Sequence, residues 1–204
     1  MTAITQLSQL DLDATYSYAD YLTWQLEETV ELIRGKISLM APAPNLKHQR
    51  VITNLGGALY NYFHKKRCQL FYAPFDVSLY DSRKSQLANR EIFSVVQPDL
   101  CVICDPDKLT TQGCSGAPDW IIEILSPGNT KKEMHLKYDL YQENGVKEYW
   151  LVYPYEQAVY QFVLNAETNL YQLFAMHAGD DIATPYLFAD LNIDLADVFA
   201  ENLF

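Results

Sequence analysis

The sequence lacks any hydrophobic run close to the ~20 consecutive apolar residues that a membrane-spanning helix requires. Residues 1–13 contain neither the basic region nor the apolar region of a secretory signal. We therefore expect no membrane-spanning segment, and the two absences together predict a cytoplasmic protein. Hydrophobic residues make up 49% of the 204-residue chain and charged residues 20%, which is the balance of a folded globular protein.

Cysteine is scarce, because the whole chain has only four: Cys68, Cys101, Cys104 and Cys114. Four thiols in a chain of this length are few for a disulfide scaffold, so we expect all of them to be reduced. Cys101 and Cys104 spell CxxC inside a predicted strand, where positions three apart point to opposite faces. We therefore interpret them as buried apolar side chains, not as a metal pair or a mutual disulfide.

Positive charge is absent from the last part of the chain, which has nine acidic residues from Glu148 onward and no Lys or Arg. The net charge of −11 disfavours a protein that coats itself in nucleic acid. Seven of the 15 basic residues nevertheless fall in one stretch, either as solvated charges or as a surface that faces phosphate groups. That stretch contains Arg34, Lys36, Lys47, Arg50, Lys65, Lys66 and Arg67.

Repeating apolar positions and capping residues predict three helices. The first is short and covers residues 16–28. The second begins at Asn45, a residue type that caps helices, and ends near Lys66. The third opens with a capping box at Thr130 and ends at Gly145, the residue type that most often terminates a helix.

The predicted strands are short, apolar or alternating segments. Polar residues 81–90 predict a loop, and so does the glycine-containing segment between the two most apolar strands. The expected strands cover residues 30–34, 36–40, 71–79, 98–104, 120–125, 148–153, 159–164 and 170–176, and residues 187–199 close the chain.

This order of elements predicts a mixed β-sheet flanked by helices, in the α/β or α+β class, with additional antiparallel strands at the C-terminal end. No repeat or composition shift divides the chain, so we expect one domain over residues 1–204. Within it, residues 1–44 form an N-terminal helix and hairpin, residues 45–154 a core, and residues 155–204 a strand extension.

Glu123 is the most informative residue, because apolar residues flank it on both sides in a predicted central strand. Leaving a carboxylate unpaired there would cost roughly several kcal/mol. Glu123 is therefore expected to be protonated, to form a salt bridge, or to bind a cation.

Asp99 follows Pro98 at the mouth of the preceding strand, although Pro-Asp is also an ordinary turn dipeptide. Adjacent strands lie ~4.8 Å apart, so Asp99 and Glu123 could share one hard cation such as Mg²⁺ if the register permits. Asp119, which follows Pro118, is a rival. It lies four residues from Glu123, about 13 Å along a strand, which is too far for both carboxylates to bind one ion.

The order and spacing of several small motifs carry a family resemblance that spans nearly the whole chain. The chain resembles the Uma-type family of putative restriction endonucleases, which belongs to the PD-(D/E)XK nuclease superfamily. The motifs that carry the resemblance are residues 31–35, His48, Gln97–Asp99, Glu123–Pro127, Lys137 with Tyr141, Gly145–Trp150 and Asp190–Asp194.

The resemblance implies a restriction-endonuclease-like core and a metal-dependent phosphodiesterase site. Asp99 and Glu123 would be metal ligands, joined by the backbone carbonyl of Ile124. One or two Mg²⁺ ions, or Mn²⁺, would polarise the phosphate and lower the pKa of a bound water.

This sequence departs from the superfamily pattern at Leu125, where a lysine two residues beyond the glutamate is expected. Lys137 is the candidate replacement, because it shares a predicted helix face with Met134, Tyr138 and Tyr141. Its expected role is to orient the attacking water and to stabilise charge that develops on the phosphate. An ordinary ion pair with Glu133 on the same helix is the alternative for Lys137.

Glu31 and His48 are carried over from the same resemblance. Glu31 could supply a further metal ligand or hold the catalytic water, or it could be a solvated carboxylate at a hairpin edge. His48 could contact the scissile phosphate, or it could be a neutral histidine hydrogen-bonded in the core. Tyr141 and Trp150 are expected in the core.

These observations predict an Mg²⁺-dependent endonuclease that acts on DNA. Two alternatives stay open: a nuclease fold that binds nucleic acid or protein without cutting, and a structural or partner-regulating protein in which Glu123 and Lys137 form a buried ion pair. A homodimer is possible, with the apolar, tyrosine-rich C-terminal strands as the interface.

Overall fold

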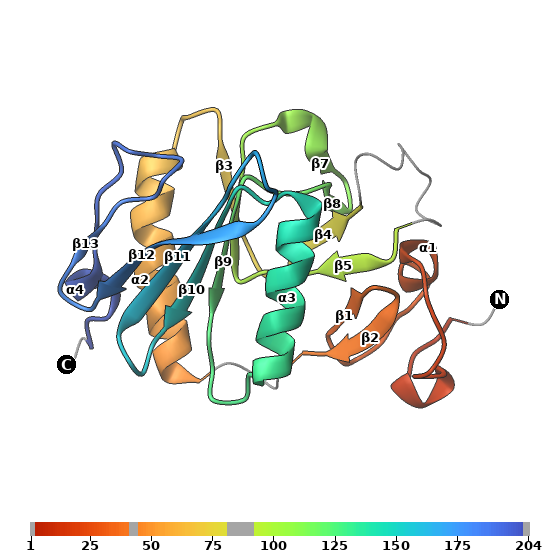
Figure 1. Cartoon of the computed structure of the whole chain (residues 1–204). Coiled ribbons are helices and arrows are strands. Elements are labelled where there is room, and N and C mark those ends of the chain that lie inside the picture. Colours follow the sequence, from red (N-terminus) through yellow and green to blue (C-terminus); the bar gives the residue numbers. More distant parts are fainter. Residues whose placement is uncertain (1–2, 41–44, 81–91, 202–204) are drawn as a thin grey trace.

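The computed structural model describes residues 3–40, 45–80 and 92–201, and its main feature is a large sheet with a long helix on either face (Figure 1). Helix α2 (Leu46–Phe63) lies on one face and helix α3 (Lys131–Asn144) on the other. This arrangement confirms the predicted class of a mixed sheet flanked by helices.

The large sheet has six strands in the order β12-β11-β10-β9-β6-β3. Only β9 and β10 run parallel, because α3 connects them as a crossover helix, and the other neighbours are antiparallel. The strands are β3 (Gln69–Tyr72), β6 (Leu100–Ile103), β9 (Trp120–Ile124), β10 (Glu148–Tyr153), β11 (Ala158–Leu164) and β12 (Tyr171–Ala178).

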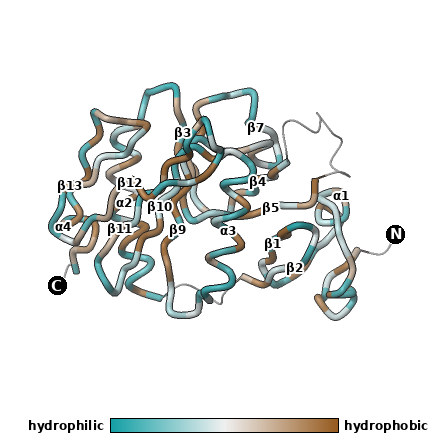
Figure 2. The backbone as a smooth tube through the Cα atoms, in the orientation of Figure 1, coloured by the Kyte–Doolittle hydropathy of each residue, from teal (hydrophilic) through white to brown (hydrophobic). Residues whose placement is uncertain are grey.

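Side chains that alternate along the central strands fill two cores, one under each helix. Val51, Leu55 and Leu59 of α2 pack on Leu100 and Trp120, among others. The opposite face of the same strands carries the apolar residues that pack against α3. Figure 2 shows this pattern as hydrophobic colour concentrated on the central strands.

A second six-stranded sheet, which the sequence analysis did not predict, packs beside the first in the order β2-β1-β5-β4-β8-β7. Its strands have only two to four residues each, so they give no clear periodicity. They are β1 (Val30–Ile33), β2 (Lys36–Leu39), β4 (Asp76–Leu79), β5 (Ser94–Val96), β7 (Leu109–Thr110) and β8 (Gly113–Ser115).

The remaining elements are short. They are the 3-10 helices η1 (Leu7–Gln9) and η3 (Pro106–Lys108), the helices α1 (Tyr18–Tyr21) and α4 (Leu195–Val198), and the paired strands β13 (Ile182–Ala183) and β14 (Ile193–Asp194). None of the helices in the described part of the chain is long and apolar enough to span a bilayer.

Local signals placed the long helices well. The side chain of Asn45 accepts a hydrogen bond from the N–H of His48 and caps α2, and Thr130 caps α3 in the same way. Gly145 ends α3 in the left-handed conformation, with φ of +82°. The predicted hairpin is also confirmed, and both turn residues, Arg34 and Gly35, have positive φ.

Three predicted elements were wrong. The helix expected over residues 16–28 is only the four-residue α1. The strand expected over residues 71–79 is two strands, β3 and β4, which belong to different sheets; Pro74 lies between them and lacks the N–H that a continuous ladder would need. The loop expected after β6 contains β7 and β8, whereas the loop expected over residues 81–90 lies outside the described residues.

The cysteines were also only partly predicted. Cys68 and Cys104 form a disulfide, which contradicts the expectation that all four thiols are reduced. The β3–β6 register explains the bond, because it pairs Gln69 with Ile103 and so brings positions 68 and 104 opposite each other. Cys101 and Cys114 are free, as expected, and both are buried.

Candidate active site

Asp99 and Glu123 lie opposite each other at the end of two neighbouring strands of the large sheet. The last residues that the antiparallel register of β6 and β9 pairs are Leu100 and Ile122, and the same register continued by one step brings Asp99 opposite Glu123. Directly opposed residues have Cβ atoms about 4.5–5.5 Å apart, so the two carboxylates share one neighbourhood.

Ile124 completes this edge through its backbone. Its N–H donates to Oδ2 of Asp99 at 2.7 Å, beyond the point where the β6–β9 ladder ends. The N–H and C=O of one strand residue point to the same side, so the Ile124 carbonyl also faces Asp99.

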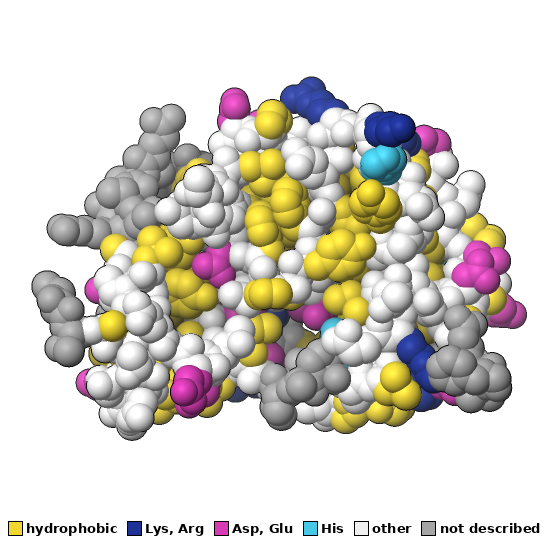
Figure 3. Space-filling view, turned by 180° about the vertical axis from the view of Figure 1, so that it is seen from behind, with side chains coloured by type: hydrophobic (Ala, Val, Ile, Leu, Met, Phe, Trp, Pro, Cys, Tyr) yellow, Lys and Arg dark blue, Asp and Glu magenta, His cyan; other side chains and the backbone are white. Residues whose placement is uncertain are grey.

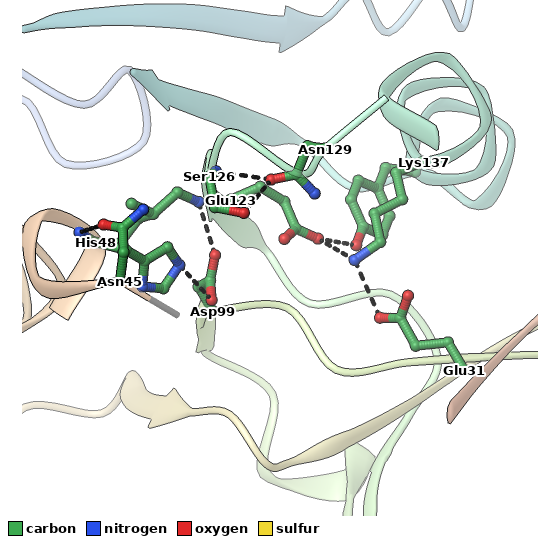
Figure 4. Close-up of polar contacts among 10 residues, drawn as sticks. Glu31, Asn45, His48, Asp99, Glu123, Ser126, Asn129 and Lys137 are labelled. Atoms are coloured by element: carbon green, nitrogen blue, oxygen red, sulfur yellow. Dashed lines mark hydrogen bonds and ion pairs between the residues drawn. The ribbon is translucent and has the colours of Figure 1, made fainter. Parts of the chain in front are cut away.

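His48 reaches the same carboxylate from helix α2. Its Nε2 lies 3.2 Å from Oδ1 of Asp99, and its side chain is buried. Its Nδ1 is buried without a hydrogen-bond partner in the described part of the chain. The N-cap at Asn45 fixes where α2 begins and therefore where His48 stands (Figure 4).

Lys137 reaches Glu123 from helix α3. Its Nζ lies 3.0 Å from Oε1 of Glu123 and 3.0 Å from Oε1 of Glu31. The hydroxyl of Tyr141, one turn further along α3, donates to Oε1 of Glu123 at 2.5 Å. The helix thus directs Lys137 toward the sheet, and the alternative pairing with Glu133 does not occur.

Glu31 was expected either as a site residue or as a solvated carboxylate at a hairpin edge, and the structure does not match the second alternative. It lies on β1 in the second sheet, is buried, and accepts a hydrogen bond from the N–H of Gln97 at 2.8 Å. The site therefore combines side chains from both sheets and both long helices, as Figure 4 shows.

Burial and neighbouring charges shift the pKa values of Glu123, Lys137 and Tyr141. Burial raises the pKa of Glu123 to about 7, an effect that Lys137 opposes and the carboxylates of Asp99 and Glu31 reinforce. Burial alone would lower the pKa of Lys137, but Glu123 and Glu31 outweigh burial and raise that pKa. Burial, followed by the charge of Glu123, raises the pKa of Tyr141 well above its ordinary value, so Tyr141 stays protonated and donates.

A cavity of about 110 Å³ is lined by Glu31, His48, Asp99, Glu123 and Lys137, among others. Figure 3 shows a hollow on the reverse face of the molecule, with acidic and histidine side chains visible inside it. Leu125, the residue in place of the superfamily lysine, also lines the cavity, and so do the Ser126 and Asn129 side chains of the turn before α3. The site is thus a polar pocket with an apolar wall.

The donor set fits a small divalent cation. Within the described ranges no group of three His, Cys, Asp or Glu residues is arranged to hold a metal. Mg²⁺, however, usually binds through one or two carboxylates and keeps several waters. Oε2 of Glu123 accepts no hydrogen bond from the described residues. Asp99 and Ile124, which line the same cavity, have a carboxylate and a backbone carbonyl as further oxygen donors.

Two further placements bear on the sequence predictions. Asp119 lies at the far end of β9, where it pairs with Lys147 at 2.7 Å and accepts from the N–H of Cys104, so it is apart from the cavity. Tyr141 was expected only in the core. Its four-residue spacing from Lys137 on one helix face was the available signal that both would reach Glu123.

Comparisons with known proteins agree with the resemblance read from the motifs. A family model described as "Uma2: Putative restriction endonuclease" matches residues 18–196. No curated protein matches the chain. A crystal structure from Anabaena variabilis ATCC 29413, described as a putative nuclease belonging to DUF820, superposes with a TM-score of 0.66 at 20% identity, covering 90% of this chain and 97% of that chain. At that identity the superposition shows a shared fold.

Proposed function

Because this chain belongs to the Uma2 family of putative restriction endonucleases, we propose that it is an endonuclease that hydrolyses the phosphodiester backbone of DNA with the help of Mg²⁺ or Mn²⁺. One observation carries the proposal. Asp99 and Glu123 oppose each other at the end of β6 and β9, and the buried ammonium of Lys137 lies 3.0 Å from Glu123.

Asp99, Glu123 and the carbonyl of Ile124 are the residues that would hold the cation. A bound divalent ion would supply positive charge to the phosphate and lower the pKa of a water molecule. The hydrogen bond from the Ile124 N–H and the His48 Nε2 atom, 3.2 Å from Oδ1, hold the Asp99 carboxylate in one orientation. Preorganised ligands of this kind avoid a reorganisation cost during the reaction.

Lys137 would perform the role of the superfamily lysine, whose expected position in this chain is occupied by Leu125. Its pKa is raised by two carboxylates, so it remains an ammonium at neutral pH. An ammonium beside the acidic pair can orient the attacking water and stabilise charge on the phosphate oxygens. His48 has a second role open to it, because its unpartnered Nδ1 belongs to a side chain that lines the cavity and could contact the scissile phosphate.

Exposed and half-exposed basic side chains lie where a nucleic-acid backbone could approach. Lys131 and Lys132 are exposed in the first turn of α3, while Lys47 and Arg50 lie in the first turns of α2. Both helix N-termini adjoin the cavity, since His48 and Glu133 line it. Helix N-termini favour anions, so phosphate groups on either side of the scissile bond are the ligands these ends would accept.

A binding module that does not cut is the second candidate function. Leu125 favours it, because the strand position that usually carries the catalytic lysine holds an apolar side chain. The buried ion pair of Lys137 with Glu123 is equally compatible with a purely structural role for both residues.

Cleavage of a supercoiled plasmid separates these candidates. We expect Mg²⁺- or Mn²⁺-dependent nicking that Asp99→Asn and Glu123→Gln each abolish and that Lys137→Met reduces to a low but measurable rate. Asp119→Asn, which changes an acidic residue just before β9 and outside the cavity, should retain nicking. DNA binding without any product in either metal would favour the module. A wild-type protein that neither binds nor cuts DNA, with Glu123→Gln affecting stability alone, would favour the structural role.

Association of two copies is also part of the proposal. In the described part of the chain, β12 has a strand neighbour on one side only, and the strand carries no charged residue. Leu173, Phe174 and Met176 on it are each more than half exposed. Uncharged edge strands with exposed apolar side chains pair readily with another strand, and a second copy supplies an identical one.

A further inference from the structure

Glu31 belongs to the second sheet, yet its side chain enters the cavity built by the first. Only 2% of the residue is exposed, although its hairpin partner strand β2 is partly open to solvent. Its Oε1 accepts two hydrogen bonds, from the N–H of Gln97 at 2.8 Å and from Nζ of Lys137 at 3.0 Å. Glu31 is thus a buried carboxylate whose Oε1 accepts a hydrogen bond from the Lys137 amine.

The geometry separates Glu31 from the oxygens that face the cation site. In Figure 4 the amine of Lys137 lies between the carboxylates of Glu31 and Glu123, and Asp99 lies on the far side of Glu123. A metal ligand must present a lone pair to the ion, but here an ammonium group stands between. The arrangement does not suit Glu31 as a metal ligand.

The same geometry suits Glu31 for holding Lys137 in place. A lysine side chain has four rotatable bonds, and a single hydrogen bond to Glu123 would leave its amine free to swing about that contact. The second bond, to Glu31, fixes Nζ from the opposite side. The two carboxylates together also compensate the cost of burying the ammonium.

Glu31 is itself held by the residues behind it. Gln97 donates its backbone N–H to Glu31, and its side-chain Nε2 donates to Oδ1 of Asp76 at 2.8 Å. Tyr21 also hydrogen-bonds to Asp76. This network joins β1, β4 and β5 of the second sheet. The position of the Lys137 amine therefore depends on that sheet as well as on α3.

We propose that Glu31 is a positioning residue that acts through Lys137 and does not bind the cation. The inference rests on the proposed function insofar as Lys137 serves DNA hydrolysis. The second sheet then has a role in the site, because it supplies the carboxylate that holds the Lys137 amine in position.

A double-mutant cycle on cleavage tests this role. Glu31→Gln keeps the size and an acceptor oxygen but removes the charge, so we expect kcat to fall by about 10- to 100-fold with KM for DNA unchanged. In the Lys137→Met background the same Glu31→Gln change should have no further effect, because its target is gone. Asp139→Asn, which changes an exposed carboxylate on the same helix outside the cavity lining, is the matched control. Effects of Glu31→Gln and Lys137→Met that multiply would overturn the proposal.

Two further measurements do not depend on activity. We expect a slowly exchanging ¹H–¹⁵N signal from the Lys137 ammonium that Glu31→Gln shifts or broadens and Asp139→Asn leaves in place. We also expect Glu31→Gln, made in the Lys137→Met background, to leave Mg²⁺ affinity within about threefold by calorimetry, whereas Asp99→Asn abolishes binding. An unchanged ammonium signal, or a tenfold or greater loss of Mg²⁺ affinity in that background, contradicts the proposal.

These arms also keep the two proposals apart. A wild-type protein that cuts no DNA refutes the proposed function, while the ammonium signal and the Mg²⁺ titration still decide the role of Glu31. If Glu31→Gln does not fold, Glu31→Asp replaces it, because it retains the buried charge but withdraws the carboxylate by one methylene. The same losses are then expected, and a fully active Glu31→Asp with an unshifted signal counts against the clamp.

Discussion

Tyr141 donates its hydroxyl to the same oxygen of Glu123 that binds the amine of Lys137. Oε1 is therefore engaged twice, and Oε2 is the oxygen left for a cation. Two residues one turn apart on α3 thus decide which side of the Glu123 carboxylate faces the acidic partner on β6.

Tyr141→Phe should destabilise the protein by about 1–3 kcal/mol, because it removes a donor from a buried carboxylate. The pKa of Glu123 should rise further, since that hydrogen bond favours the charged form. Urea unfolding measures the stability change. Tyr138→Phe on the same helix is the control, because its hydroxyl hydrogen-bonds to none of the described residues. Equal effects of the two substitutions would refute the assigned contact.

Asp119 should make stability depend on pH in the acidic range. Burial alone would raise its pKa, but the hydrogen bonds from Lys147 and from the N–H of Cys104 lower it below the ordinary value. A lowered folded-state pKa stabilises the protein above the unfolded value of about 3.9, and this stability is lost as pH falls through the lowered pKa. Asp119→Asn should flatten that part of the curve in urea unfolding from pH 7 to pH 2. An unaltered slope would show that the pairing contributes nothing.

Glu148 should be needed for attachment of the C-terminal segment. Its Oε1 accepts from Trp150, Gln161 and the N–H of Tyr186, and its Oε2 accepts from the N–H of Leu187. Glu148→Gln places an amide donor against one of these donors, so we expect a loss of about 1–3 kcal/mol. Protease nicking should appear near residue 186 at the same time. Glu156→Gln at an exposed turn serves as comparison, and a Glu148→Gln protein as stable as wild type would exclude this role.

Lys131 and Lys132 should contribute to DNA binding through charge alone. In an Asp99→Asn background that cannot cut, replacing both by Ala should reduce the slope of log K against log salt by about two for duplex DNA. Lys65→Ala with Lys66→Ala is the matched pair, at the opposite end of α2 and about 27 Å from its N-terminus. Equal slope changes for the two pairs would argue against an approach at the helix N-termini.

Charges placed on the β12 edge should separate two associated copies. Phe174→Lys and Met176→Lys put like charges on both partners of a paired edge, so the dimer expected for wild type should become a monomer. Sedimentation velocity at micromolar concentrations measures this, with Leu12→Lys as an exposed apolar control elsewhere. A monomeric wild type would end the proposal.

Much of the large sheet and both long helices follow from local sequence signals. These signals are the caps at Asn45 and Thr130 and the apolar runs around Leu100 and Ile122. Each spans only a few residues, so it predicts its element without knowledge of the tertiary structure. The opposition of Asp99 and Glu123 could also be anticipated, because neighbouring strands end near each residue. Their exact pairing needed the register.

The second sheet could not be predicted, because it joins very short strands from distant parts of the chain. The sequence consequently left open whether Glu31 is a site residue or a solvated carboxylate, and its burial follows only from the docking of β1 beside β5. The Cys68–Cys104 bond depends likewise on the β3–β6 register, which periodicity does not encode. Predicting the partners of Lys137 required knowing how α3 is rotated about its own axis.

The origin of Glu31 in the hairpin limits how far this protein can be shortened. The hairpin precedes α2, and the segment that carries Asp99, Glu123 and Lys137 comes later in the chain. A fragment that begins at Asn45 would retain both acids and the amine but would leave Lys137 with one carboxylate. Any minimal version built for engineering should therefore retain β1 or receive an equivalent acid from a grafted strand.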